Sequence, residues 1–282
     1  MKKLVRIAAA CVALLAARNA AATPSTLFWT PATTYVQPFL VPHITYDTYF
    51  NDKGAYPMDL GLTMGILPFE AVQMEVGLDV FLPYWSPIPG AGFFASPAGA
   101  FQANAKIALV ENSFGDWFPG ISAGIYGVGF TKGTSFDILH LEIGKTFFFG
   151  AITVGGYYGV GEEALWLGSN GSVNRAGFIG SYVTPDIVLD LKGLYKINFF
   201  ADVQTGKNAF GAVGGGVGIY FTPSIDILTG PVFFLDKGVQ PPYDGVGSSF
   251  MWSVQLDVDI DFAPAPKAPP APAEAPKEAP KA

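Results

Sequence analysis

Apolar and polar side chains alternate along most of this chain. In the segment 187–201 the odd positions are mainly apolar, and the even positions include Asp190, Lys192 and Lys196. A period of two is the period of a β-strand, because successive side chains point to opposite faces. The run is longer than a common soluble strand, and about ten residues suffice for a tilted strand to cross a bilayer.

The same alternation recurs in twelve segments: 35–48, 57–67, 71–82, 100–110, 119–131, 136–147, 150–161, 176–184, 187–202, 209–221, 225–236 and 248–262. Short connections at 67–70, 148–150, 184–186 and 222–224 contrast with longer, more polar ones at 83–99, 162–175, 203–208 and 237–247. Short turns on one side and long loops on the other are typical of transmembrane β-barrels. The pattern therefore predicts an all-β fold, a closed antiparallel transmembrane barrel of about twelve strands over 35–262.

Aromatic residues gather near the ends of the predicted strands, for example at Phe69, Tyr84, Trp85, Trp117 and Phe148. Membrane barrels carry aromatic girdles at both interfaces with water. The alternative is a secreted β-sandwich or jelly roll, whose polar face would meet bulk water and would be rich in Lys, Glu and Thr. Here the second face is rich in Gly, Ser and Asp, which favours the barrel.

The N-terminus has the pattern of a secretory signal peptide. Lys2, Lys3 and Arg6 precede the apolar run 7–17, and an A-x-A cleavage site ends at Ala22. An apolar run of this length is too short for a membrane-spanning helix, although a single N-terminal anchor is the alternative. We therefore expect a signal peptide at 1–22, a periplasmic lead-in at 23–34, and a mature chain without cysteine, since Cys11 lies within the signal.

Composition separates the barrel from a C-terminal tail. The segment 263–282 holds seven prolines and eight alanines in twenty residues, so we expect it to be disordered and extended. Four of the 16 basic residues lie in the signal region and three in the tail, and two of the 23 acidic residues lie in the tail, which leaves 23–262 with a net charge of −12. That charge argues against nucleic acid as a partner. The tail could tether the barrel to the cell wall or a periplasmic partner, or be simply solvated.

The chain resembles Gram-negative outer-membrane β-barrel proteins, and the likeness covers the signal, the alternating body and the last strand. Such proteins typically end in an alternating strand with a final Phe, which the barrel-insertion machinery recognises. The stretch "WSVQLDVDIDF", from Trp252 to Phe262, is similar to that signal. The resemblance implies a porin-like monomer in outer-membrane lipid. An even strand number places both termini in the periplasm.

Carboxylates outnumber lysines on the face predicted to line the lumen. Parity assigns to it Asp47, Asp59, Glu75, Asp79, Glu142, Asp190, Asp202, Asp226, Asp257, Asp259 and Asp261, against Lys106, Lys192 and Lys196. Unpaired carboxylates are costly in a dry interior, so the lumen should hold water, and acidic rings favour cations. We expect the most negative part at the periplasmic mouth, around Asp226, Asp257, Asp259 and Asp261, with Asp190 and Lys192 nearby. The alternative is that these charges pair with lysines or solvate a narrow, plugged lumen.

Nothing in the sequence indicates catalysis or a resident metal or cofactor. Both histidines, His43 and His140, fall on the predicted lumen face, and neither has a Ser two positions later, as a barrel lipase would need. The series Asp257, Asp259 and Asp261 lacks the Gly and Glu of a calcium loop.

The sequence therefore favours a passive, cation-favouring channel for small polar solutes or ions. Two alternatives stay open. One is a non-conducting barrel that acts through the loops 83–99 and 237–247, and the other is an integral-membrane hydrolase.

Overall fold

The computed structural model describes residues 26–51, 58–82, 101–130, 135–236 and 249–260. Within these ranges the chain forms one short 3-10 helix, η2 (Glu163–Trp166), and the strands β1 (Pro42–Asn51), β2 (Met58–Gly65), β3 (Val72–Leu82), β4 (Phe101–Leu109), β5 (Gly120–Gly129), β6 (Ile138–Phe147), β7 (Gly150–Gly159), β8 (Ala176–Val183), β9 (Ile187–Leu191), β10 (Leu194–Gln204), β11 (Ala212–Thr222), β12 (Ile225–Phe234) and β13 (Phe250–Asp259). No helix in these ranges is long and apolar enough to span a membrane. The predicted signal peptide, the tail 263–282 and Phe262 lie outside them.

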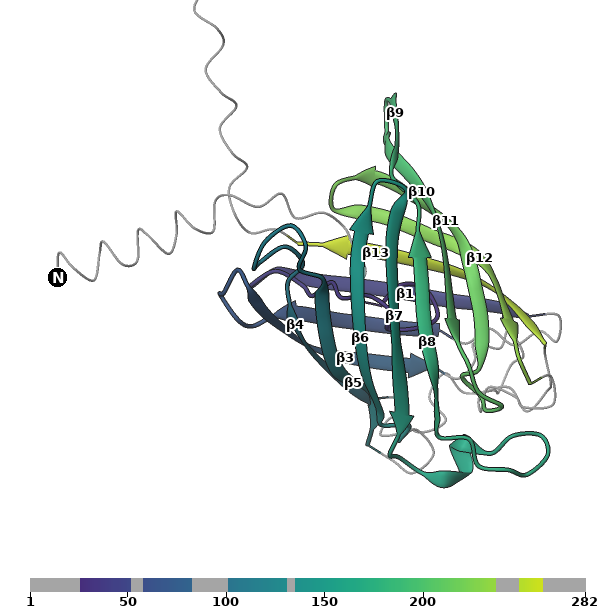
Figure 1. Ribbon diagram of the computed structural model, residues 1–282. Coiled ribbons are helices and arrows are strands. Elements are labelled where there is room, and N and C mark those ends of the chain that lie inside the picture. The colour runs from purple at the N-terminus through teal and green to yellow at the C-terminus, as the bar shows by residue number, and fades with distance from the viewer. Residues whose placement is uncertain (1–25, 52–57, 83–100, 131–134, 237–248, 261–282) are drawn as a thin grey trace, which may run out of the picture. The chain divides into compact units, whose positions relative to one another are not determined.

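All the described strands except β9 close into one antiparallel barrel (Figure 1). Each strand pairs with its neighbour in sequence from β1 to β8, β10 joins β8 to β11, and β13 pairs with β1 to complete the ring. Closure gives the backbone N–H and C=O groups of the wall partners within the sheet, which a lipid environment requires. The predicted fold class, a closed antiparallel barrel of twelve strands, is confirmed.

The prediction of one continuous ninth strand over 187–202 was wrong, because the structure divides this range into β9 and β10. Both β8 and β9 pair with β10, so 184–186 is an irregularity within one long arm and not a turn between barrel strands. The true turn is at Lys192–Gly193, where Gly193 has a φ of +84° that suits glycine. In Figure 1 the tip of this hairpin extends past the neighbouring turns.

The outer wall is apolar and the inner wall is polar. Large apolar side chains are exposed on the outer face in every part of the barrel, including Leu62, Leu78, Leu141, Phe178 and Trp252. The alternating positions between them hold buried polar groups such as Glu75, Lys106, Ser122, Asn198 and Gln255. This is the reverse of a water-soluble domain and fits a barrel whose outer face meets lipid. The predicted assignment of faces by parity is confirmed for these strands.

The two ends of the barrel differ. At the end that we call the turn end, the connections include 66–71, 148–149, 192–193 and 223–224, whereas the fully described connections at the opposite, loop end are 160–175 and 205–211. Exposed aromatics mark the turn end, where Phe148 is 94% and Trp117 75% accessible. This distribution matches one aromatic girdle of a membrane barrel.

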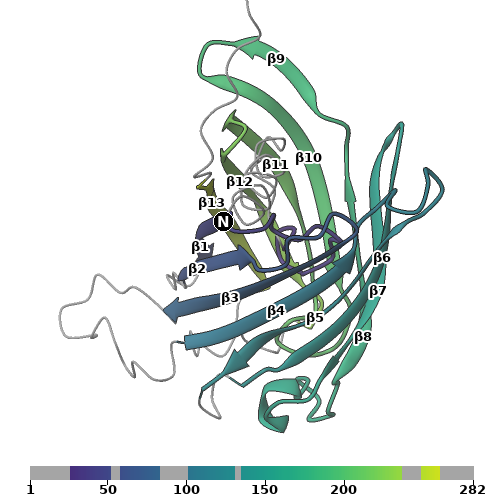
Figure 2. The ribbon, with the colours of Figure 1, turned by 90° about the vertical axis from the view of Figure 1, so that its left-hand side faces the viewer.

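The N-terminal segment, residues 26–41, runs inside the barrel rather than at the periplasmic surface. Leu27, Phe28, Ala32, Val36 and Gln37 are buried. In Figure 2 the purple N-terminal trace lies within the ring of strands. The expected lead-in at 23–34 is thus, from residue 26 onward, a lumen-filling segment.

The first predicted strand, 35–48, was also placed too early. The structure starts β1 at Pro42, and Leu40, two residues before it, has a φ of 58°, outside the strand region. Pro38 has no N–H to donate to a ladder, which explains why the extended pairing begins only after it.

A charge on the lipid face should be costly and a charge on the β9–β10 hairpin should not. We expect Leu141→Arg, in the middle of β6, to lower the free energy of unfolding by about 2–4 kcal/mol. Val188→Arg, on the hairpin beyond the rim, should cost less than about 1 kcal/mol. Urea unfolding in lipid vesicles measures both, and equal losses would contradict the assigned lipid face.

Candidate functional site

One carboxylate holds the N-terminal segment against the barrel wall. Oδ2 of Asp202, on β10, accepts hydrogen bonds from the backbone N–H groups of Trp29 and Thr30, each at 2.8 Å. Asp202 is 2% exposed, and hydrogen bonds to a charged group are stronger than neutral ones. The indole Nε1 of Trp29 also donates to the carbonyl of Phe210 at 2.8 Å. These bonds provide partners for backbone groups that would otherwise be unpaired inside the lumen.

Further anchors come from strands spread around the ring. Glu75 on β3 accepts from the Gln37 N–H at 2.8 Å, and its other oxygen lies 3.5 Å from Lys106 Nζ. Gln255 on β13 donates to the Phe28 carbonyl at 2.7 Å, and Ser181 on β8 donates to the Ala32 carbonyl at 2.6 Å. Because β3, β8, β10 and β13 all contribute, the segment is surrounded by the wall. The predicted lumen residues Glu75 and Lys106 therefore form a buried ion pair that supports it.

Glycines on the inner wall make room for this segment. A Cβ at Gly214 of β11 would lie 2.9 Å from Phe28 Cδ1, and one at Gly65 of β2 would collide with the carbonyls of Gln37 and Pro38. The sequence suggested that inward glycines either leave the lumen open or admit a large side chain. Gly214 admits a large side chain, and that side chain is Phe28 of the N-terminal segment.

The segment has a cavity on each side of it. The loop-end cavity, about 180 Å³, is lined by Thr26, Trp29, Asp47, Asp59, Asp79, Asn104, Tyr126, Phe136 and Phe210 among others. The turn-end cavity, about 350 Å³, is lined by Thr33, Thr34, Glu111, Lys145, Asp186, Lys196 and Tyr220 among others. A solute that crosses the barrel must therefore pass the N-terminal segment.

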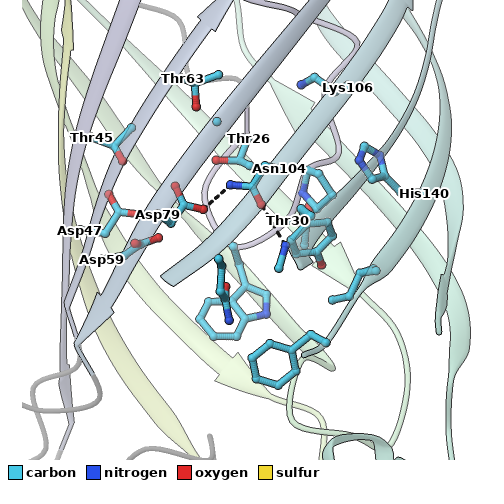
Figure 3. Close-up of a pocket in the computed structure, with 18 of the residues that line it drawn as sticks. Thr26, Thr30, Thr45, Asp47, Asp59, Thr63, Asp79, Asn104, Lys106 and His140 are labelled. Atoms are coloured by element: carbon cyan, nitrogen blue, oxygen red, sulfur yellow. Dashed lines mark hydrogen bonds between the residues drawn. The ribbon is translucent and has the colours of Figure 1, made fainter. Parts of the chain in front are cut away.

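Three aspartates on adjacent strands form one wall of the loop-end cavity, and we call them the acidic wall: Asp47, Asp59 and Asp79 (Figure 3). Asp47 of β1 is directly opposite Asp59 of β2, and Asp79 of β3 is opposite Gly61, two residues along β2. Asn104 donates to Asp79. Among the described residues, none of the three carboxylates is in an ion pair, and Oδ1 of Asp59 is buried without a hydrogen-bond partner. Three carboxyl groups therefore lie close together here without a basic partner among the described residues, an arrangement that is destabilising whenever they are charged.

The charges of the turn-end cavity are balanced instead. Lys145 Nζ lies 3.1 Å from Glu111, and Lys196 Nζ lies 2.8 Å from Asp186 and over the ring of Tyr220. Burial would raise the pKa of Glu111, but hydrogen bonds from Thr146 and the nearby Lys145 ammonium lower it below its usual value. In each of these two pairs a lysine is matched by one carboxylate, so the pairs add no net charge to the turn-end cavity.

The carboxylates of the predicted acidic mouth are buried and lie beside a histidine. Asp226, Asp257 and Asp259 lie together at the turn end, as expected from parity, but all three are buried. His43 is between two of them, with Nδ1 2.8 Å from Asp259 and Nε2 3.2 Å from Asp257. Asp259 also interacts with Gln37 of the N-terminal segment. None of the three carboxylates lines either cavity described above, and the expectation that this mouth is the most negative part of the lumen stays a prediction.

Other predicted site residues have different outcomes. Lys192 is exposed in the turn between β9 and β10, so its assignment to the lumen was wrong. Asp190 belongs to β9, but the structure does not describe its side chain, and Asp261 and Phe262 lie outside the described ranges. Trp252 is on the outer face and donates from Nε1 to Thr229 Oγ1 at 2.9 Å. Its role in an insertion signal stays a prediction.

His140 and Glu142 lie side by side on the inner wall. His140 Nδ1 is 2.5 Å from Glu142 Oε1, and Ser122 donates to the other oxygen of Glu142 at 2.7 Å. In a nucleophilic triad the histidine stands between the serine and the acid, so that it can accept the serine proton. Here the acid is in the middle, which does not activate Ser122. No group of described His, Cys, Asp and Glu side chains is arranged to hold a metal ion.

Sequence reasoning missed the N-terminal segment, and the acidic wall was recognised only as part of a longer set of carboxylates. The aromatic pair Phe28–Trp29 was the available signal, because it interrupts a region that was expected to be a polar lead-in. Its place inside the lumen depends on Asp202, 172 residues away from Thr30.

No protein-family model and no curated protein sequence matches this chain. Solved structures with a similar fold include an outer membrane channel from Pseudomonas putida F1, with 11% identity, 82% of this chain and 99% of that chain covered, and a TM-score of 0.45. A mutant of Rh. blastica porin has 8% identity, coverages of 78% and 99%, and a TM-score of 0.34. Escherichia coli outer membrane phospholipase A has 11% identity, coverages of 89% and 96%, and a TM-score of 0.41. At identities of 8–11% and TM-scores below 0.5, these similarities concern the fold alone. A function for this chain has to be inferred from its own side chains.

Removal of the Asp202 carboxylate should loosen the N-terminal segment. We expect Asp202→Ala to increase the hydrogen-exchange rates of the Trp29 and Thr30 amides at least about tenfold, because two hydrogen bonds to a charged group are lost. Ser181→Ala removes one neutral bond to the same segment and should have a smaller effect on these amides. Unchanged exchange in Asp202→Ala would show that the carboxylate does not hold the segment.

The Glu111 contacts predict a pH-dependent contribution to stability. A folded-state pKa below the ordinary value means that the stabilisation is present above about pH 4.3 and is lost as the pH falls through the folded-state pKa. Glu111→Gln should therefore be less stable than wild type by about 1 kcal/mol at neutral pH, and the difference should vanish in acid. Urea unfolding at several pH values measures this. A difference that grows in acid would contradict it.

Proposed function

We propose that this protein is an outer-membrane channel for passive diffusion of small polar solutes, with a preference for cations. The acidic wall carries the proposal. Asp47, Asp59 and Asp79 face a cavity in the lumen, and no described basic side chain pairs with them. A cavity lined by charge of one sign concentrates the opposite ion and repels its own sign.

The preference arises at the loop end. Lys106 is the one lysine among the described residues that line the loop-end cavity, and Glu75 Oε1 lies 3.5 Å from its Nζ. At the turn end, Lys145 and Lys196 are matched by Glu111 and Asp186. Cation preference should therefore depend on the acidic wall and not on the buried carboxylates near His43.

The N-terminal segment sets the size of solute that can pass. It fills the space between cavities of about 180 and 350 Å³, and strands around the ring hold it in place. A barrel of about this strand number is narrow even without an internal segment. The proposed solutes are accordingly ions and small polar molecules.

One observation favours a second candidate, a non-conducting barrel that acts through its outer loops. The same segment that narrows the lumen could close it. The loops 83–99 and 237–247 that such a role would use lie outside the described residues. We propose no enzymatic activity, because the described Ser122, Glu142 and His140 stand in an order that does not activate the serine.

Planar-bilayer recordings in a KCl gradient test the channel and its selectivity together. We expect ion conductance with a reversal potential that shows cation preference. The triple variant Asp47→Asn, Asp59→Asn and Asp79→Asn should lower the cation-to-anion permeability ratio by about tenfold, equal to about 1.4 kcal/mol, because it removes the excess charge and keeps side-chain size.

Asp116→Asn is the matched control. Asp116 is exposed in the connection between β4 and β5 at the turn end, away from the loop-end cavity, so its loss should leave the ratio unchanged. Absence of conductance would favour the non-conducting barrel. Anion preference, or a triple variant with wild-type selectivity, would contradict the role of the acidic wall.

A further inference from the structure

The loop-end cavity has an apolar aromatic wall as well as its acidic wall. Trp29, Phe136 and Phe210 line the same cavity as Asp47, Asp59 and Asp79. An inorganic cation needs only the oxygen ligands and gains little from aromatic rings, so the second wall calls for a different explanation.

The aromatic wall is held in a fixed arrangement. The rings of Phe136 and Phe210 meet edge to face, with centroids 4.4 Å apart and planes at 87°. Trp29 meets Phe234 at 5.4 Å and 85°, and its indole N–H is bound to the Phe210 carbonyl. Aromatic groups that are already fixed lose little entropy when a ligand packs on them.

In the acidic wall, one carboxylate oxygen, Oδ1 of Asp59, has no hydrogen-bond donor among the described residues. Asn104 donates to Asp79 and Tyr49 donates to Asp47, whereas the buried Oδ1 of Asp59 has no partner among the described residues. A buried acceptor without a donor is costly, so a ligand N–H at this position would be favourable. Figure 3 shows Asp59 beside Asp47 and Asp79 at one side of the pocket, with Lys106 and His140 away from them.

The two walls together discriminate between ligand classes. An organic anion would be repelled by three carboxylates, and a neutral aromatic molecule would remove water from them without supplying a positive charge. An organic ammonium ion satisfies both walls, because its N–H groups meet the carboxylates while its apolar body and its charge meet the rings. A cavity of about 180 Å³ suits a small ligand of this class.

We propose that the loop-end cavity is a binding site for small organic ammonium ions that carry an apolar or aromatic group. Asp59 accepts a hydrogen bond from the ammonium, Asp47 and Asp79 supply the surrounding negative charge, and Phe210 and Phe136 contact the apolar body. This deepens the proposed function by naming a solute class, and it relies on that function only for the route across the membrane.

Binding can be measured on the folded barrel in detergent, without any ion current. Isothermal titration calorimetry would compare benzylammonium with benzyl alcohol and benzoate, which share the ring and differ in charge, and with ammonium, which lacks the ring. We expect a Kd for benzylammonium of about 1 mM or tighter. The three other probes should bind at least about tenfold more weakly.

Variants then separate the two walls. Asp59→Asn should weaken benzylammonium about tenfold. Phe210→Leu should weaken it about threefold while ammonium binding stays the same. Asp116→Asn, as before, should bind like wild type. A heat-modifiability gel shift confirms that each variant is a folded barrel.

Two results would overturn the inference. Benzyl alcohol binding as tightly as benzylammonium would mean a merely apolar cavity, and ammonium binding as tightly would mean a simple cation site. The bilayer recordings remain independent of both. Cation-selective current without benzylammonium binding would remove this inference and leave the channel, whereas binding without current would leave the site and remove the channel.

Discussion

The interior of this barrel is organised by the carboxylate of Asp202, which binds two consecutive backbone amides of a segment whose one described strand pairing is the bridge between Phe39 and Gly65. A chain that crosses a lumen must find a partner for each N–H and C=O, and the wall provides them through side chains. Asp202 and Glu75 accept from amides, while Gln255 and Ser181 donate to carbonyls. The position of the segment then determines where the two cavities lie.

The same arrangement explains why charges at the two ends behave differently. At the turn end, Asp226, Asp257 and Asp259 surround His43 and are covered, and the lysines beside the cavity are matched by Glu111 and Asp186. At the loop end, Asp47, Asp59 and Asp79 face open space. In the proposed channel, the charge presented to a solute would therefore depend on which carboxylates line a cavity and not on their total number.

The alternation along the sequence was sufficient to predict the closed barrel, the lipid face and the inward position of Glu75, Lys106 and Glu142, because a strand period of two is a local property. It failed where the outcome depends on distant contacts. By its position in the alternation Lys192 should point into the lumen. It lies in a turn instead, because β8 and β9 both pair with β10 and the chain reverses after β9. Likewise, nothing local to Phe28 and Trp29 indicates that Asp202 will hold them inside the lumen. Parity placed Asp257 and Asp259 correctly on the inner face, yet only the packed interior shows that they are covered.

The proposed channel depends most on residues 26–37 of the N-terminal segment, which occupy the lumen and should restrict passage through it. The most direct measurement is the single-channel conductance of the protein with these residues deleted, compared with wild type in the same bilayer and salt. The segment lies between both cavities, so the deletion should give a clearly larger conductance. Equal conductance in the two proteins would contradict this restriction.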